Sequence, residues 1–275
     1  MTDQGDPLAR IADALERLAP KAAAPVDWQG APAYVWDGSG GRAVAHLLAP
    51  PLALLRGIDQ QKALVTANVA RLAAGHAAHD MLLWGSRGMG KSALIRASVV
   101  AADAAHPGGL ALVQVGQDAL SEFVPLFAAL GRIDRRFLVY IDDLGFEDGD
   151  GNGPRLLRSL LEGGIEARPG NVRLAVTSNR RAIVSRHASE QDDPLNPRDA
   201  VDDRLALADR FGLSIGFHNC SQDDYLAIIG GYVEEMGLSC EPAEALEWSR
   251  RRGARSGRVA WQFVTELAGR AGRSL

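Results

Sequence analysis

The sequence contains only two cysteines, Cys220 and Cys240, among 275 residues. Two cysteines are too few for the disulfide framework of a small secreted domain, and their spacing does not suit a metal site. The charge is also nearly balanced, with 30 basic and 34 acidic residues and a net charge of −4. The chain therefore has no overall positive field that would attract nucleic acid, although a local basic patch remains an alternative.

Long apolar runs are absent as well, since every run is well short of the roughly 18 residues of a membrane span. The first residues lack the basic region and apolar run of a signal peptide. Apolar residues at 47% and charged residues at 23% match ordinary globular usage, which excludes disordered and collagen-like chains. We therefore expect a cytoplasmic protein without membrane contact, with about two domains or one domain and a lid.

Short apolar runs, by contrast, recur between helical stretches from residue 51 onward. The five strands that these runs predict are 81–84, 110–115, 137–141, 174–177 and 213–217. One helix is predicted before the first of these strands, at 58–74, and others between the strands at 91–104, 120–130 and 154–163. Continuous apolar strands that alternate with helices are typical of a parallel sheet with helices on both faces.

After residue 217 only helices are predicted, at 222–236, 242–251 and 257–271. The sequence thus predicts an α/β fold: a parallel five-stranded sheet flanked by helices, followed by a small all-helical C-terminal lid. The domains expected are an N-terminal extension at 1–50 with a short helix at 7–19, the α/β domain at 51–219 and the lid at 220–275. The alternative for residues 1–50 is a surface cover packed on the main body. The polar, proline-broken stretch 187–200 predicts a loop.

Residues 85–92, Gly-Ser-Arg-Gly-Met-Gly-Lys-Ser, match the pattern of a phosphate-binding loop. A predicted strand precedes them and a predicted helix begins at Lys91, the order that this chemistry requires. Lys91 can reach the β- and γ-phosphate oxygens, and the Ser92 hydroxyl can ligate Mg²⁺. The positions expected to bind the nucleotide here are Gly85, Ser86, Arg87, Gly88, Met89, Gly90, Lys91, Ser92 and Ala93.

Polar side chains end two of the predicted strands. Asp142 and Asp143 follow the strand at 137–141, and Asn179 follows the strand at 174–177. Parallel strands bring their carboxyl ends to the same sheet edge as the loop. We expect Asp142 to hold Mg²⁺, Asp143 to act as general base and Asn179 to orient the attacking water. A solvated acidic turn and a plain turn asparagine are the structural alternatives, and Glu147 is a reserve carboxylate.

These strand ends, in this order and before a helical C-terminus, resemble the AAA+ superfamily of P-loop ATPases over residues 51–272. A closer resemblance is to a bacterial family of uncharacterised AAA+-type ATPases. The stretches that carry it are 54–59, 84–92, 141–147, 161–169, 177–181 and 209–213. The resemblance implies ATP or ADP with Mg²⁺ as ligands, and Leu55, Gly57 and Ile58 match the segment that lies against the adenine.

The resemblance also implies roles for two arginines. Arg210 matches the arginine finger that reaches a neighbour's nucleotide, and Arg258 matches the lid arginine that senses the γ-phosphate. Arg210 could instead form a surface ion pair with nearby acidic residues. Arg258 lies in a basic run, 250–258, whose structural alternative is a solvated helix face. In most of the superfamily a glutamate stands where this chain has Asp143, and the shorter side chain predicts slow hydrolysis.

We therefore expect an ATPase that forms a homo-oligomer, a ring or a dimer, in its ATP state and acts on a protein client that the sequence does not identify. One alternative is a slowly hydrolysing nucleotide-dependent switch or scaffold. Another is a DNA-loading or remodelling factor, although nucleic-acid binding has no support beyond the basic run. A P-loop kinase is the weakest alternative, because it would not need Arg210 and Arg258.

Overall fold

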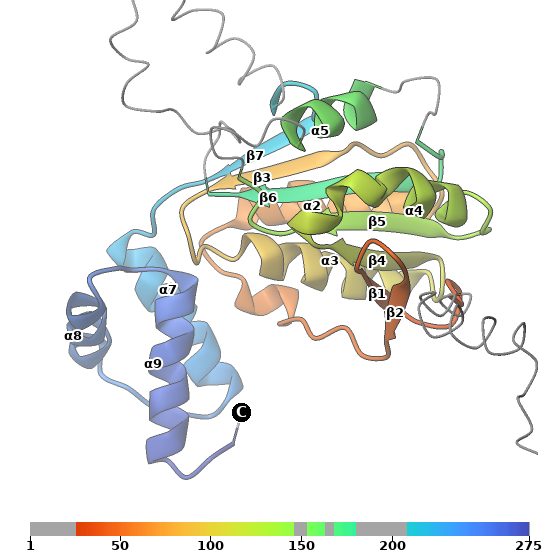
Figure 1. The fold of residues 1–275 in the computed structure, drawn as a ribbon. Helices are drawn as coiled ribbons and strands as arrows, with labels where there is room; N and C mark the ends of the chain where they lie inside the picture. Colours follow the sequence, from red (N-terminus) through yellow and green to blue (C-terminus); the bar gives the residue numbers. More distant parts are fainter. Residues whose placement is uncertain (1–25, 146–152, 163–167, 180–207, 275) are drawn as a thin grey trace, which may run out of the picture.

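The computed structural model describes residues 26–145, 153–162, 168–179 and 208–274. The predicted helix at 7–19, the predicted loop at 187–200 and Glu147 lie outside these residues. The described strands are β1 (Ala33–Trp36), β2 (Gly41–Val44), β3 (Met81–Gly85), β4 (Leu110–Val115), β5 (Arg136–Ile141), β6 (Val172–Ser178) and β7 (Leu213–Phe217). They form a single sheet in the order β2-β1-β4-β5-β6-β3-β7 (Figure 1).

The α/β class and the five parallel strands are confirmed, but the predicted strand count is wrong. The described sheet has seven strands, because β1 pairs in parallel with β4 and β2 pairs antiparallel with β1. Both come from the segment that the sequence assigned to an N-terminal extension. The boundaries 1–50, 51–219 and 220–275 remain predictions.

Arg135 explains why this N-terminal segment is held on the sheet. Its guanidinium is buried and donates hydrogen bonds to the carbonyl oxygens of Trp28 at 3.0 Å and Ala31 at 2.7 Å. A third bond, of 3.0 Å, reaches the carbonyl oxygen of Leu110 at the start of β4. Hydrogen bonds from a charged donor are stronger than neutral ones, so this arginine fixes the chain just before β1 against the sheet.

Helices cover both faces of the sheet (Figure 1). The helices of the α/β part are α2 (Asp59–Ala73), α3 (Lys91–Ala105), α4 (Phe123–Leu130) and α5 (Gly153–Glu162), with short 3₁₀ helices η1 (Leu52–Leu54) and η2 (Gln117–Glu122). Side chains of α2 and α3 share one buried apolar cluster, and those of α4 and α5 belong to the other. The helix predicted at 120–130 is thus shorter, since its first residues belong to η2.

The C-terminal helices form the lid, beyond the carboxyl ends of the strands (Figure 1). They are α7 (Gln222–Glu235), α8 (Pro242–Arg252) and α9 (Gly257–Arg270). Ser221 and Asp224 form a capping box at the start of α7, and the Ser256 hydroxyl caps α9. Buried lid residues such as Tyr225 and Phe263 belong to the same apolar cluster as α2 and α3, so the lid shares a core with the sheet domain.

None of the described helices combines the length and the hydropathy that a membrane-spanning segment requires.

Candidate active site

The glycine-rich loop connects β3 to α3 at the carboxyl edge of the sheet. Its first residue, Gly85, has a φ of 119°, and a Cβ atom there would lie 2.1 Å from the carbonyl oxygen of Phe217 in β7. Only glycine fits this close approach. Gly90, with a φ of 86°, is the N-cap of α3. The loop therefore leads into a helix N-terminus, whose free N–H groups and dipole favour an anion.

Lys91, the first residue of α3, turns its side chain back along the loop. Its Nζ donates hydrogen bonds to the carbonyl oxygens of Gly85 at 2.8 Å and Ser86 at 2.9 Å. A longer contact of 3.4 Å joins Nζ to Oδ1 of Asn179, at the end of β6. The loop, its lysine and the predicted polar sensor thus lie together, although 88 residues separate Lys91 from Asn179.

Charges of both signs surround the Lys91 amine. Desolvation is the largest influence on its pKa and lowers it, whereas the carboxylates of Asp143 and Asp142 act in the opposite direction. Arg87 in the loop and Arg258 in the lid lower the pKa of Lys91 further. Three cationic side chains that influence one another at a helix N-terminus make a site suited to a polyanion.

Asp142 is held by hydroxyl groups from two elements. Ser92 Oγ in α3 donates to Asp142 Oδ1 at 2.7 Å, and Thr177 Oγ1 in β6 donates to the same oxygen at 2.6 Å. Desolvation alone would raise the pKa of Asp142, but the neighbouring hydroxyls of Thr177, Tyr140 and Ser92 together lower it. This carboxylate therefore stays ionised beside a hydroxyl, a donor set that fits Mg²⁺.

Asp143 and Asn179 form a second polar contact at the carboxyl edge of the sheet, beside the one between Ser92 and Asp142. The side-chain amide of Asn179 donates to an Asp143 carboxylate oxygen, while its own oxygen faces Lys91. The Asp143 backbone has a φ of 52°, and its N–H donates to Thr177 Oγ1 at 2.8 Å. This left-handed backbone conformation suits aspartate better than longer side chains.

The lid touches the loop directly. The backbone N–H of Arg258, in the first turn of α9, donates to the carbonyl oxygen of Gly88 at 3.1 Å. A Cβ atom at Gly88 would lie 2.9 Å from Ser256 Oγ and 3.1 Å from Arg258 Cβ. The start of α9 is therefore packed on the middle of the loop, which brings Arg258 to the candidate site.

The predicted adenine segment lies between the loop and the lid. Side-chain atoms of Ile58 and Leu55 are 3.7 and 3.8 Å from the position of a Cβ atom at Gly90. Gly57 has a φ of 75°, and a Cβ atom at Gly57 would lie 3.2 Å from the Asp224 side chain of α7. Of the remaining predicted positions, Met89 is buried in the same cluster as Leu55 and Ile58, Ala93 packs against that cluster and Arg87 is exposed.

Arg210 is the predicted residue that the fold keeps away from the others. It precedes β7, which runs parallel to β3 with Leu213 opposite Met81 and Phe217 opposite Gly85. Arg210 thus stands at the amino end of these strands, whereas the loop follows their carboxyl end. Five residues of strand span about 16 Å, so Arg210 does not join the site of its own chain.

Beside the loop, a cleft of about 530 Å³ lies at the carboxyl ends of β6, β3 and β7. It is lined by Trp84, Gly85, Ser86, Asn179, Phe217, His218 and Asn219. Ser86 Oγ donates to Asn219 Oδ1 at 2.6 Å across the cleft, which connects the loop to the segment that leads into the lid.

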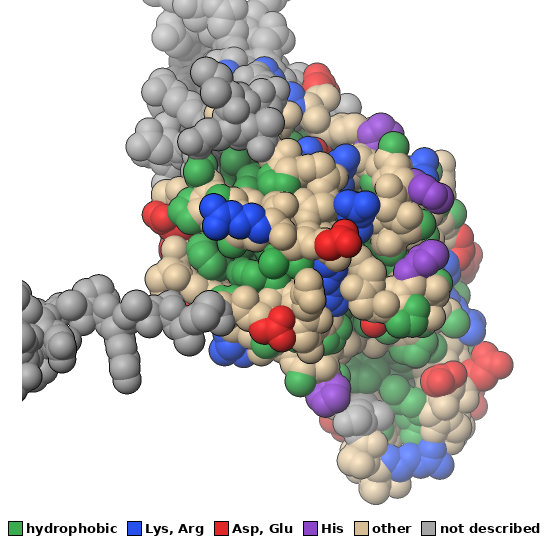
Figure 2. Space-filling view, turned by 90° about the vertical axis from the view of Figure 1, so that its right-hand side faces the viewer, with side chains coloured by type: hydrophobic (Ala, Val, Ile, Leu, Met, Phe, Trp, Pro, Cys, Tyr) green, Lys and Arg blue, Asp and Glu red, His purple; other side chains and the backbone are tan. Residues whose placement is uncertain are grey.

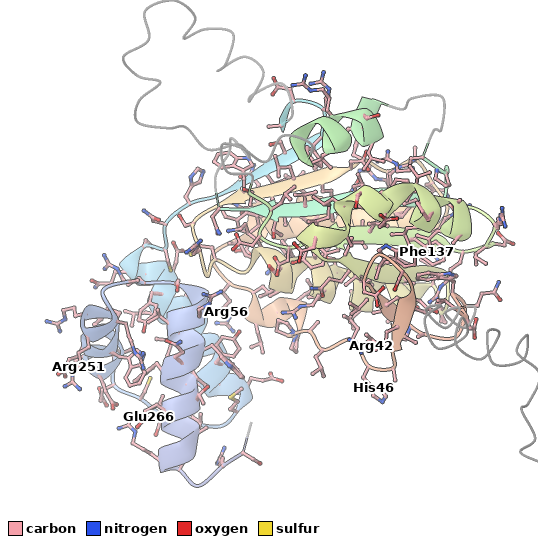
Figure 3. All side chains as sticks on the ribbon, viewed as in Figure 1. Arg42, His46, Arg56, Phe137, Arg251 and Glu266 are labelled. Atoms are coloured by element: carbon pink, nitrogen blue, oxygen red, sulfur yellow. The ribbon has the colours of Figure 1, made fainter. Side chains whose placement is uncertain are left out.

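Arg56 provides another contact between the sheet domain and the lid. In Figure 3 it lies between the two, and its guanidinium pairs with Glu234 of α7 at 3.4 Å.

A protein-family model described as "Protein of unknown function (DUF815)" matches residues 29–271. The chain belongs to this family. No curated protein matches it.

Solved structures with similar folds include the Thermotoga maritima RuvB Holliday junction branch migration motor, at 18% identity and a TM-score of 0.51 over 83% of this chain and 68% of that one. The Aeropyrum pernix ORC1 protein, in complex with DNA, is 16% identical with a TM-score of 0.54 over 83% of this chain and 66% of that one. The fold of the DUF815 chain is therefore that of the AAA+ ATPases.

Two arginines of the basic run, Arg251 and Arg252, contact other side chains of the lid. Arg251 forms an ion pair with Glu247, and the Arg252 guanidinium lies 4.9 Å from the centre of the Trp248 ring. These two contacts favour the solvated helix face over a nucleic-acid surface. The side of the molecule away from α8, shown in Figure 2, presents interspersed basic and acidic side chains among the described residues.

Thr177 is the site residue that sequence reasoning missed in this DUF815 chain. Its hydroxyl holds Asp142 and accepts from the Asp143 N–H, so it connects both carboxylates. The signal was a hydroxyl side chain in the apolar strand, two residues before Asn179. Alternation along a strand places such neighbours on one face, but only the register of β5 and β6 brings Thr177 opposite the carboxylates.

We expect Gly88→Ala to weaken nucleotide binding about tenfold, because an added methyl group would push α9 off the loop at a cost of about 1–3 kcal/mol. The matched control is Gly253→Ala, since Gly253 has a similar φ of 67° but no atom within 4 Å of its Cβ position. Titration of a fluorescent ADP analogue compares the two variants. Equal affinities would mean that the contact between lid and loop plays no part in binding.

Proposed function

We propose that this chain is a Mg²⁺-dependent ATPase that couples ATP binding and hydrolysis to the remodelling of an oligomer or of a protein partner. The observation that carries the proposal is the 2.7 Å hydrogen bond from Ser92 to Asp142. It joins the phosphate-loop hydroxyl to the strand-end carboxylate, the two groups that would hold the ion.

The chemistry of the site follows from these side chains. When bound, Mg²⁺ would neutralise charge on the phosphate oxygens. Lys91 and Arg258 stabilise the charge that develops on the γ-phosphoryl group during in-line attack. Asn179 orients the attacking water, and Asp143 accepts the proton of that water.

The base pocket is the less constrained part of the proposal. Leu55 and Ile58 are buried beside the loop and offer an apolar wall to a flat base. The choice of adenine over guanine comes from the AAA+ resemblance. A competition assay with ATP and GTP tests it, and we expect ATP to displace a fluorescent ADP analogue at lower concentration.

The position of Arg210 supports an oligomeric active state. Because it stands at the amino end of β7, its role as an arginine finger requires the nucleotide of a second copy of the chain. Neighbouring copies in a ring or a dimer would then complete each other's sites. This makes turnover depend on assembly.

Steady-state ATP hydrolysis at several protein concentrations tests the proposed function, with Mg²⁺ and with EDTA. We expect turnover per subunit to rise with protein concentration and to require Mg²⁺. If ATP neither binds nor is hydrolysed at any concentration, the chain is not an ATPase.

A second candidate is a nucleotide-dependent switch or scaffold that hydrolyses ATP slowly. The observation that favours it is Asp143, which is one methylene shorter than the usual glutamate and whose carboxylate is occupied by the Asn179 amide. Such a chain would bind ATP tightly, and the lid contact at Gly88 would report the bound state.

Asp143→Glu separates the two candidates. The longer side chain reaches further toward the water, so we expect about a tenfold rise in turnover from better general-base catalysis. The φ of 52° adds a stability cost of about 1 kcal/mol for glutamate, which thermal unfolding will show. Asp143→Asn is the matched control and should lower turnover. If Asp143→Glu remains folded without gaining activity, the length of the side chain does not limit the reaction.

A further inference from the structure

Tyr140 lies under the proposed magnesium site. It stands in β5, two residues before Asp142, which directly follows this strand. The alternation of the strand places Tyr140 on the face of β5 that α3 covers, and Ser92 of α3 donates to Asp142. The residue is 2% exposed and joins the apolar cluster that contains the buried side chains of α3. A phenylalanine would fill such an apolar position equally well, so the hydroxyl calls for an explanation.

The Tyr140 hydroxyl is buried, and it has no hydrogen-bond partner among the described residues. The Tyr34 hydroxyl, in comparison, donates to the Asp27 carbonyl oxygen at 2.7 Å and accepts from the Ala31 N–H at 3.0 Å. An unpaired buried hydroxyl destabilises a fold, so it needs an explanation, such as a functional role in the site beside it.

The neighbour that can use this hydroxyl is the Asp142 carboxylate. Ser92 and Thr177 both donate to Oδ1, so neither satisfies the other oxygen, Oδ2. The Tyr140 hydroxyl lies close enough to Asp142 to be among the groups that lower the pKa of this carboxylate.

We propose that Tyr140 is a positioning residue of the magnesium site: its hydroxyl donates to the Asp142 carboxylate and holds it in the orientation that binds the cation. The proposal rests on the proposed Mg²⁺-dependent function. If the Ser92 hydroxyl binds the ion, it no longer donates to Asp142. Thr177 and Tyr140 are then the donors that orient the Asp142 carboxylate. Such supporting hydrogen bonds orient metal ligands and raise metal affinity.

Tyr140→Phe tests the proposal, and Tyr225→Phe is its matched control. Tyr225 lies in α7, is fully buried and also has a hydroxyl without a partner among the described residues. The readout is the binding of a fluorescent ADP analogue in EDTA and along a Mg²⁺ titration. For Tyr140→Phe we expect unchanged affinity in EDTA and about a tenfold higher Mg²⁺ concentration for half-maximal tightening. Tyr225→Phe should behave as wild type.

A Tyr140→Phe protein with the Mg²⁺ dependence of wild type would overturn the proposal and leave the proposed function intact. If wild type itself binds ADP without any effect of Mg²⁺, the proposal and the proposed Mg²⁺-dependent function both fail.

If Tyr140→Phe does not fold, fluorine NMR of wild type labelled with 3-fluorotyrosine tests the proposal instead. The chain has four tyrosines, so Tyr→Phe variants at 34, 225 and 232 assign the Tyr140 signal. Mg²⁺ added to the ADP complex should shift it, and an unmoved signal overturns the proposal.

Discussion

Replacing Lys91 with alanine is expected to lower ATP affinity by about a hundredfold or more and to abolish hydrolysis. The Lys91 amine is buried at the loop and bonds to the carbonyl oxygens of Gly85 and Ser86. An amine held there can exchange these neutral acceptors for phosphate oxygens. Hydrogen bonds to charged groups contribute about 1.5–3 kcal/mol each, and two such bonds give this factor.

The measurement for Lys91→Ala is calorimetric titration with ATP in the presence of Mg²⁺, together with thermal unfolding to verify the fold. Arg132→Ala is the control, because Arg132 is an exposed cation near the amino end of β5, away from the loop. A folded Lys91→Ala protein that binds ATP within a few-fold of wild type would contradict the assignment of this loop to phosphate.

The sequence predicted the central strands well for a physical reason. Strands such as 137–141 and 174–177 are buried on both faces, so their apolar runs are continuous and easy to recognise. The strands at 33–36 and 41–44 are only four residues long, with Gly38 and Gly40 between them and Gly41 as the first residue of the second. What holds them is the pairing with β4 and the buried Arg135, which no local pattern shows.

The candidate site was predictable only in its local parts. The loop is a contiguous motif, and Asp142, Asp143 and Asn179 each end an apolar strand. Thr177 was missed because a hydroxyl inside a strand normally reads as packing, and its role depends on the register between β5 and β6. The contact between Gly88 and the start of α9 joins segments about 170 residues apart and could be found only in the fold.

Arg210→Ala is expected to lower turnover by about a thousandfold while leaving ATP affinity within a few-fold of wild type. Arginine fingers supply at least that factor, because they contact the γ-phosphoryl group only as charge develops on it. The alternative, a surface ion pair with neighbouring acidic residues, predicts little change in turnover and at most about 1 kcal/mol in stability. Steady-state hydrolysis and thermal unfolding of the single variant distinguish these two interpretations.

Mixing variants then tests whether Arg210 acts on another copy. Lys91→Ala keeps the finger but lacks a working loop, whereas Arg210→Ala keeps the loop but lacks the finger. If neighbouring copies complete each other's sites, a mixture of the two inactive proteins should regain a measurable part of wild-type turnover. If both residues served one and the same chain, every subunit in the mixture would remain defective. The amino-end position of Arg210, one strand length from the loop, predicts the first outcome. A mixture that stays inactive although mixed oligomers form would disprove action between copies.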